Sequence, residues 1–187
     1  VTQTWLVQKD GYLYAPVCDN VWFWIIRVDE APGNAEKIMQ QQIPSNLQSN
    51  VYFGIVLGPD STLYPYWKAL SLPRHICTYH IDTGGNILNT YNYSIPVSYT
   101  QSSLNVVEDN IFIDTAGNLY TQYYYNDSLS HTHFRLVKLY SNQTLAYDTA
   151  INGIDPNSEL LMTDNAGNLY FDVAGYQVIK VDTSLNI

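Results

Sequence analysis

Short runs of apolar residues alternate with polar turns along this chain, and the pattern repeats at a nearly constant interval. A Leu-Tyr pair begins at positions 13, 63, 119 and 169, so successive copies lie 50, 56 and 50 residues apart. This period is typical of a β-propeller blade, which is one four-stranded unit with its loops. The pattern predicts four such units in 187 residues.

A turn sequence precedes each Leu-Tyr pair. Asp114-Thr-Ala-Gly-Asn-Leu-Tyr120 recurs as Asp164-Asn-Ala-Gly-Asn-Leu-Tyr170, and weaker copies lie at 10–14 and 60–64. Apolar segments at 52–57, 106–113 and 160–162 come before three of these turns. Because Gly and Asn tolerate a positive φ, we expect each turn to close a hairpin between strands A and B of a blade.

A second apolar segment follows in every unit, at 25–29, 79–82, 137–140 and 179–182, and each ends in an acidic or polar turn. These segments predict strand C and a second hairpin with strand D. We therefore expect one all-β domain, a β-propeller over 1–187, with blades at about 1–43, 44–100, 101–152 and 153–187. An ordinary β-sandwich is the alternative, although sandwiches seldom keep one turn sequence at constant spacing.

These repeats resemble the blades of NHL, gluconolactonase-like and related β-propellers, which carry a D-x-x-G-N-[IL]-Y turn and later a V-x-[VI]-D strand end. The resemblance implies the architecture, while propellers host enzymes, adhesins and scaffolds alike. Two arrangements stay open. The units form a closed four-blade ring, or they are part of a larger propeller, because the last unit stops at Ile187, at the start of its strand D.

Composition excludes several classes. Hydrophobic residues make up 46% and charged residues 13%, which argues for a folded chain. Eight Lys and Arg against 17 Asp and Glu give a net charge of -9, so nucleic acid is a poor partner. The longest apolar run, Val21 to Ile26, is too short to cross a bilayer. Because the chain starts at Val1 without a charged and apolar leader, we expect a processed or excised sequence.

Ligand binding is expected at the end of the blades where the B–C loops lie, since loop length varies there. The spans from the Leu-Tyr tyrosine to the end of strand C are 14, 17, 19 and 11 residues. Blades two and three thus have the long loops, 64–75 and 123–133, which hold three of the four histidines. Aromatic and imidazole groups suit a carbohydrate or small molecule. The expected ligand-binding residues are Tyr66, Trp67, His75, Tyr124, Tyr125, His131 and His133.

Two kinds of metal site are conceivable. His131 and His133 would lie on one face of a strand and, with His75, could hold zinc or copper, although surface histidines at loop ends are the simpler interpretation. Carboxylates before two strands A form the other set, which could hold Ca²⁺ or act as acid and base. Gluconolactonase-like enzymes place such acids around the channel mouth, and a solvated acidic rim is the alternative. These carboxylates are Glu108, Asp109, Asp155 and Glu159.

Three N-glycosylation sequons, at Asn92, Asn126 and Asn142, predict an extracellular or cell-surface glycoprotein. Cys18 and Cys77 fall in strand B of blade one and strand C of blade two, where they pair across neighbouring blades or are buried as small apolar residues. No G-x-S-x-G, H-E-x-x-H, P-loop or C-x-x-C sequence occurs, so the familiar hydrolase, nucleotide-binding and redox sites find no support.

Three functions follow as hypotheses. The first is a non-enzymatic binding or adhesion module that recognises a protein or glycan, at a cell surface or within a filament or virion, and needs no cofactor. The second is a metal-dependent enzyme of the lactonase or lyase kind, with Ca²⁺ near the channel. The third is a structural subunit whose last blade is completed by a strand from a neighbouring copy, which gives a homo-oligomer or filament.

Overall fold

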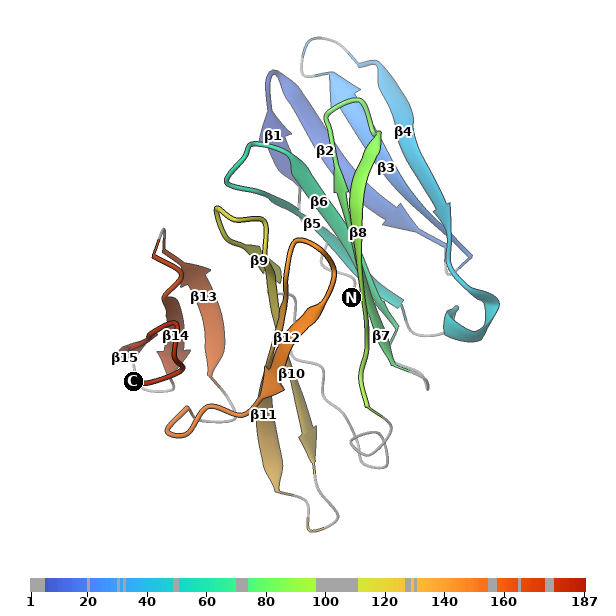
Figure 1. Cartoon of the computed structure of the whole chain (residues 1–187). Coiled ribbons are helices and arrows are strands. Elements are labelled where there is room, and N and C mark those ends of the chain that lie inside the picture. Colours follow the sequence, from blue (N-terminus) through green and yellow to red (C-terminus); the bar gives the residue numbers. More distant parts are fainter. Residues whose placement is uncertain are drawn as a thin grey trace. The chain divides into compact units, whose positions relative to one another are not determined.

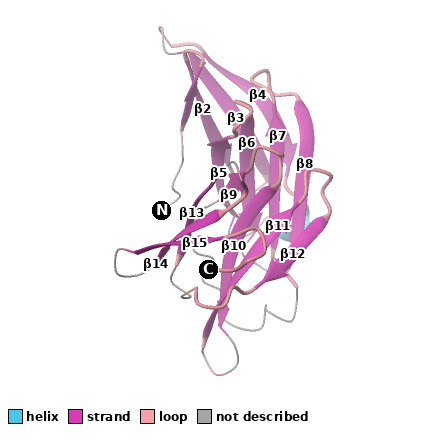
Figure 2. Ribbon diagram, turned by 60° about the vertical axis from the view of Figure 1, so that its left-hand side comes forward, coloured by secondary structure: helices cyan, strands magenta, loops and turns pink. Residues whose placement is uncertain are grey.

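The structure is a computed structural model of the chain, and it is built almost wholly of strands (Figures 1 and 2). It describes residues 6–19, 21–29, 31, 33–48, 51–69, 74–96, 111–126, 129, 131–154, 158–164, 166–173 and 177–187. None of the helices in these ranges is long and apolar enough to cross a membrane. The chain divides into two compact units, Val1–Pro96 and Val97–Ile187.

The first unit holds two antiparallel sheets of four strands each. A short 3-10 helix, η1 (Ser45–Leu47), lies between them in the sequence. Sheet 1 has the order β1 (Val7–Lys9), β2 (Tyr12–Cys18), β3 (Trp22–Asp29), β4 (Ala35–Gln42). Sheet 2 has the order β5 (Val51–Leu57), β6 (Leu63–Ala69), β7 (His75–Ile81), β8 (Ile87–Ser94).

The second unit holds two further antiparallel sheets, of four and three strands in the described part of the chain. Sheet 3 contains β9 (Ile111–Ile113), β10 (Leu119–Asn126), β11 (Thr132–Leu139) and β12 (Leu145–Thr149). Sheet 4 contains β13 (Glu159–Thr163), β14 (Leu169–Val173) and β15 (Gln177–Val181). Each sheet follows the up-and-down strand order of a propeller blade. The predicted all-β, β-propeller-like fold is confirmed.

The Asp-x-x-Gly-Asn turns form as expected. In sheet 3, Gly117 N–H donates to the Asp114 carbonyl at 2.9 Å, and Gly117 takes φ 75°. Oδ1 of Asp114 accepts the backbone N–H groups of Ala116 and Asn118, both at 2.9 Å. Asp164 makes the same pair of bonds in sheet 4. The aspartate side chain therefore satisfies the backbone of its own turn.

The same turn also closes a C–D hairpin, the one between β7 and β8. Oδ1 of Asp82 accepts the N–H groups of Gly84 and Asn86, both at 2.9 Å. The amide group of Asn86 donates to the other oxygen of Asp82 at 2.7 Å, and these bonds lower the pKa of Asp82. The same five-residue turn therefore occurs both between strands A and B and between strands C and D of this fold.

The weaker copies in the first unit differ from the predicted turn. Between β1 and β2 the turn has only two residues, Asp10 and Gly11, at φ 54° and 79°, which suits a two-residue hairpin. Between β5 and β6, Gly58 occupies the position that aspartate has in the other turns, and its N–H donates to the Thr62 carbonyl at 2.9 Å. Asp60 lies two positions later and binds Thr62 through Oδ1.

Each unit has its own apolar core. In the first, the ring of Phe23 from sheet 1 stacks on Tyr79 of sheet 2 with centroids 6.2 Å apart. In the second, Phe134 of sheet 3 meets Phe171 of sheet 4 edge to face at 5.6 Å. Within each unit, neighbouring sheets therefore pack face to face through aromatic residues.

A buried glutamine joins the two sheets of the second unit. Oε1 of Gln122, on β10, accepts the backbone N–H of Leu160, on β13, at 2.7 Å. Its Nε2 donates to the hydroxyl of Tyr124 at 3.1 Å, and that hydroxyl donates to the carbonyl of Ser158. Because Gln122 is only 1% exposed, these hydrogen bonds satisfy its side-chain amide inside the core.

Candidate functional site

Three of the predicted ligand-binding residues are core residues instead. Tyr66, Trp67 and Tyr124 are at most 2% exposed. The indole N–H of Trp67 donates to the hydroxyl of Tyr79 at 3.4 Å inside the core of the first unit. A ligand on the surface reaches none of these three rings, so this part of the prediction is wrong.

The reason is that strands occupy the segments that were predicted to be long loops. β6 continues to Ala69 and β7 begins at His75, while β10 continues to Asn126 and β11 begins at Thr132. Every residue of β6 is buried. The extra length of these two units therefore extends the sheets and their cores.

His75 lies at the start of β7 and is held on both ring nitrogens. Nε2 lies 3.2 Å from Oδ1 of Asn92, and Nδ1 lies 3.0 Å from Oγ of Ser94. Burial lowers the pKa of His75, which favours the neutral ring. Since the amide oxygen only accepts, Nε2 carries the proton and Nδ1 accepts from Ser94. His75 thus holds the two side chains that define the Asn92 sequon.

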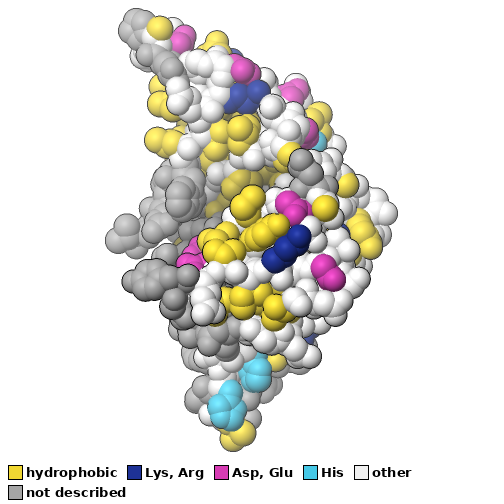
Figure 3. All heavy atoms as spheres, turned by 90° about the vertical axis from the view of Figure 1, so that its left-hand side faces the viewer, with side chains coloured by type: hydrophobic (Ala, Val, Ile, Leu, Met, Phe, Trp, Pro, Cys, Tyr) yellow, Lys and Arg dark blue, Asp and Glu magenta, His cyan; other side chains and the backbone are white. Residues whose placement is uncertain are grey.

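The other candidates lie in the second unit. His133, on β11, stacks on Tyr125, its partner on β10, with centroids 4.9 Å apart. His131 is exposed and precedes the strand. Histidine side chains gather at the lower tip of the surface seen in Figure 3. Since His75 belongs to the first unit, a patch shared by all of them stays a prediction.

The carboxylate site also stays a prediction. Glu108, Asp109 and Asp155 lie outside the described residues. Glu159, on β13, is partly exposed and lies opposite Asp172 of β14. Across the described ranges, no three His, Cys, Asp or Glu side chains are grouped so that they could hold a metal ion.

Each cysteine lies in the strand predicted for it, Cys18 on β2 and Cys77 on β7. Asn92 is exposed on β8, Asn126 ends β10, and Asn142 is exposed in the turn between β11 and β12. Neither Cys18 nor Cys77 forms a disulfide, and Cys18 packs against the core cluster that contains Cys77. Burial raises the pKa of the Cys77 thiol to about 12, so this thiol stays protonated and inert.

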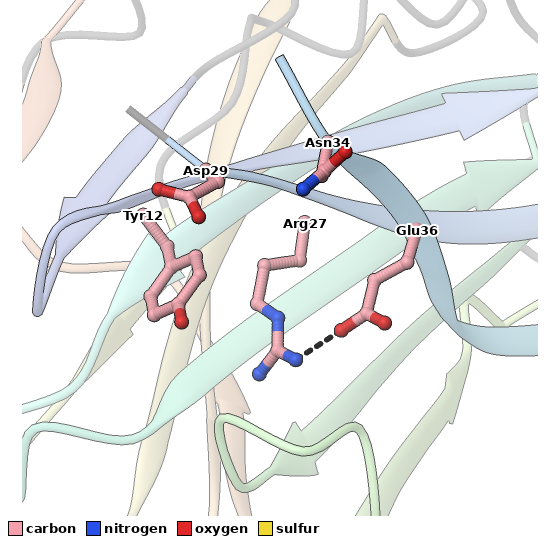
Figure 4. A pocket seen from close by; sticks show the side chains of 5 residues that line it. All are labelled: Tyr12, Arg27, Asp29, Asn34 and Glu36. Atoms are coloured by element: carbon pink, nitrogen blue, oxygen red, sulfur yellow. Dashed lines mark hydrogen bonds and ion pairs between the residues drawn. The ribbon is translucent and has the colours of Figure 1, made fainter. Parts of the chain in front are cut away.

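A pocket of about 180 Å³ opens on sheet 1 (Figure 4). It is lined by side chains from β2, β3, β4 and the turn between β3 and β4, namely Tyr12, Arg27, Asp29, Asn34 and Glu36. Register explains how they meet, because Tyr12 pairs with Asp29 and Arg27 pairs with Glu36 across the sheet.

Arg27 is the centre of this pocket and is fixed from three directions. Its guanidinium carbon lies 4.8 Å from the ring centroid of Tyr12. Figure 4 shows the two side chains next to each other. Nη1 donates to the carbonyl of Thr83, in the turn between β7 and β8, at 3.1 Å, and Nη2 pairs with Oε1 of Glu36. A side chain held in this way loses little freedom when a ligand binds.

Several polar atoms of the pocket are left for a ligand. Asp29 uses Oδ1 to accept the N–H of Ala31 at 3.0 Å. Its Oδ2, Oε2 of Glu36 and the side-chain amide of Asn34 form no hydrogen bond within the described residues. The pocket therefore offers acceptors, amide donors and an aromatic edge in one place.

Sequence reasoning missed this pocket because its residues come from three strands and share no motif. The signal that could have found it is the acid at the end of strand C, Asp29, beside the Arg27 two residues earlier. Only the register across β2, β3 and β4 brings Tyr12 and Glu36 to the same point.

The comparisons with known proteins add the following. No family model and no curated protein matches the chain. Among solved structures, an uncharacterized protein, lmo1340, of Listeria monocytogenes EGD-e has a TM-score of 0.47 and 8% identity over 96% of this chain. An endo-arabinase from Bacteroides thetaiotaomicron VPI-5482 has a TM-score of 0.47 and 10% identity over 95% of this chain. The chain covers 55% and 72% of those two chains, respectively.

Proposed function

We propose that this chain is a non-enzymatic binding module that recognises a saccharide, in the pocket around Arg27, in an extracellular or cell-surface setting. The observation that carries the proposal is the set of free polar atoms beside the Tyr12 ring and the fixed guanidinium of Arg27. The remaining carboxylate oxygens of Asp29 and Glu36 accept hydrogen bonds from hydroxyl groups, and the side-chain amide of Asn34 both donates and accepts. An aromatic edge adds contact with the apolar face of a sugar ring.

The charge of the pocket supports a neutral ligand rich in hydroxyl groups. Arg27 is paired with Glu36, which leaves Asp29 as the uncompensated charge. An anionic ligand would meet that carboxylate at close range, which costs free energy. The exposed sequons at Asn92 and Asn142 support the extracellular setting.

Binding to a printed array of oligosaccharides, followed by calorimetry with the strongest ligand, tests this proposal. We expect Asp29→Asn and Tyr12→Ala each to weaken binding roughly tenfold, the loss of about one good hydrogen bond or ring contact. Asp10→Asn removes an exposed carboxylate outside the pocket and serves as the charge-matched control. Binding to no array ligand overturns the proposal, and so does a ligand whose affinity both pocket variants leave unchanged.

A further inference from the structure

Sheet 1 has two apolar faces. One packs on sheet 2 through Tyr14, Phe23 and Ile25. The alternate residues of β2 and β3 point the other way, and we call them the far face of sheet 1. They are all apolar and all partly exposed or exposed: Leu13, Ala15, Val17, Trp22, Trp24, Ile26 and Val28.

Cross-strand register makes this far face continuous. Leu13 pairs with Val28, Ala15 with Ile26 and Val17 with Trp24. Val17 is 41% exposed. Of the seven side chains on this face, those of Trp22 and Trp24 can form a hydrogen bond, through the indole N–H. A contiguous apolar surface with so few polar groups is typical of a face that another protein surface covers, rather than of a sugar site.

Sheet 4 carries a second apolar surface on the side away from its core. Its buried side holds Leu169, Phe171 and Val181. The opposite side, which we call the far face of sheet 4, exposes 52% of Met162 and 63% of Val178. Figure 3, which looks onto the side of β13, β14 and β15, shows apolar side chains among acidic and basic ones.

The net charges of the two far faces are of opposite sign. On β4 the cation Lys37 lies opposite Ile26, at the border of the far face of sheet 1. On sheet 4 the carboxylates of Glu159 and Asp172 lie opposite each other. They outnumber the cation on this face, Lys180, which lies two residues from Val178 along β15. Each surface therefore combines an apolar centre with a charge that suits the other.

We propose that the far face of sheet 1 in one copy of this chain packs against the far face of sheet 4 in a second copy. Sheets stack face to face about 10 Å apart, with their side chains interdigitated. Because the two surfaces differ, the contact is head to tail. The pocket around Arg27 stays open in this assembly, since Arg27 points to the opposite side of sheet 1 from Trp24.

Light scattering coupled to size-exclusion chromatography, over a range of concentrations, tests the proposal. We expect a mass of two or more copies that falls towards one copy on dilution. Trp24→Glu and Val178→Glu should each weaken association roughly tenfold or more, because each buries a charge in the contact. Leu145→Glu, at a residue 51% exposed on sheet 3, is the matched control and should change nothing.

Mixing the two variants gives the decisive result. The Trp24→Glu chain keeps the far face of sheet 4, and the Val178→Glu chain keeps that of sheet 1, so an equimolar mixture should regain a two-copy species. Circular dichroism checks that each variant is folded, and Trp22→Gln replaces Trp24→Glu if the latter is not. A wild-type chain that is monomeric at every concentration, as ring closure within one chain predicts, overturns the proposal. Failure of the mixture to associate also overturns it.

Discussion

The hydroxyl of Tyr120 donates a hydrogen bond to Oδ2 of Asp114 across 3.1 Å, which ties the start of β10 to the turn before it. Burial, together with the Asp114 carboxylate, raises the pKa of Tyr120, so its proton remains in place. Lys138, its partner on β11, lies 4.8 Å over the tyrosine ring. Tyr170 makes the same bond to Asp164 at 3.0 Å. In sheets 3 and 4 the tyrosine of the repeated Leu-Tyr pair thus anchors the turn to its sheet.

This anchoring predicts a loss of stability in acid. The hydrogen bond from Asn168 is the main reason why the pKa of Asp164 is lowered to about 2, against about 3.9 in an unfolded chain. Because the folded-state pKa is the lower one, the contribution is complete above about pH 4 and disappears as the pH falls towards 2.

Urea unfolding at a series of pH values measures this effect. The midpoint of Asp164→Asn should depend less steeply on pH than that of the wild type between about pH 4 and 2. Asp172→Asn, at an exposed strand position, is the control and should keep the wild-type slope. Identical slopes for wild type and Asp164→Asn would contradict the interpretation.

Gly85 should be far more sensitive to substitution than Gly33. Both take a positive φ, 87° and 81°. A Cβ on Gly85 would lie 2.0 Å from the carbonyl oxygen of Ile38 on β4, whereas one on Gly33 meets nothing within 4 Å. We expect Gly33→Ala to cost about 1–2 kcal/mol of unfolding free energy, the backbone term alone. Gly85→Ala should cost about 1–3 kcal/mol more.

Denaturant unfolding of the two alanine variants checks this difference. Because the backbone term is common to both, their difference isolates the contact between the sheet 2 turn and β4. Equal losses would show that the turn does not rest on Ile38.

Gln122 should hold sheet 4 on sheet 3. Gln122→Met keeps the volume of the side chain but leaves the N–H of Leu160 without its acceptor. We expect a loss of about 1–3 kcal/mol, the cost of one buried, unsatisfied N–H group. Hydrogen exchange should accelerate at the amides of β13 and β14 before those of β11.

The control for this prediction is Gln177→Met, at an exposed position on β15. It should leave both the unfolding free energy and the exchange pattern unchanged. Uniformly faster exchange across the second unit in Gln122→Met would argue against a local role.

His75 should titrate below its ordinary range. Burial lowers its pKa, so the folded state binds fewer protons than the unfolded state near the ordinary value of about 6.5. Its stabilising effect is therefore complete above that value and is lost as the pH falls through the lower, folded-state pKa. NMR of the ring nitrogens should show the Nε2–H tautomer at neutral pH.

The same measurement in urea gives the reference pKa of the unfolded chain. Ser94→Ala removes the donor to Nδ1 and should shift the tautomer balance while the strand remains paired. A folded-state pKa at or above the unfolded value would contradict the burial argument.

The turns could be predicted because their chemistry is local. Asp114 and Asp164 bind atoms within six residues of themselves, so a short stretch of sequence contains every residue that forms the turn. The copy at Asp60 was misaligned for an equally local reason. Asp60 lies two positions later in its turn than Asp114 does in the turn of sheet 3, and its carboxylate still accepts a hydrogen bond from Tyr64 at 3.4 Å. A motif that requires the aspartate at a fixed position therefore misaligns this copy.

The candidate site was harder to predict because it depends on pairing across strands. In β6 every residue is buried, so the alternation that marks a half-exposed strand is missing, and the sequence pattern predicts a loop there. It therefore predicts Tyr66 and Trp67 at a surface. The pocket at Arg27 requires the register of three strands, which no spacing along the chain encodes.

The self-contained turns also bear on the order of folding. Since Asp82, Asp114 and Asp164 each close their turn with bonds that span at most six residues, a hairpin needs no distant segment before it forms. Contacts between residues close in the sequence form quickly. We expect each hairpin to form independently of the others. Because each has its own turn, it can fold while later parts of the chain are still being synthesised.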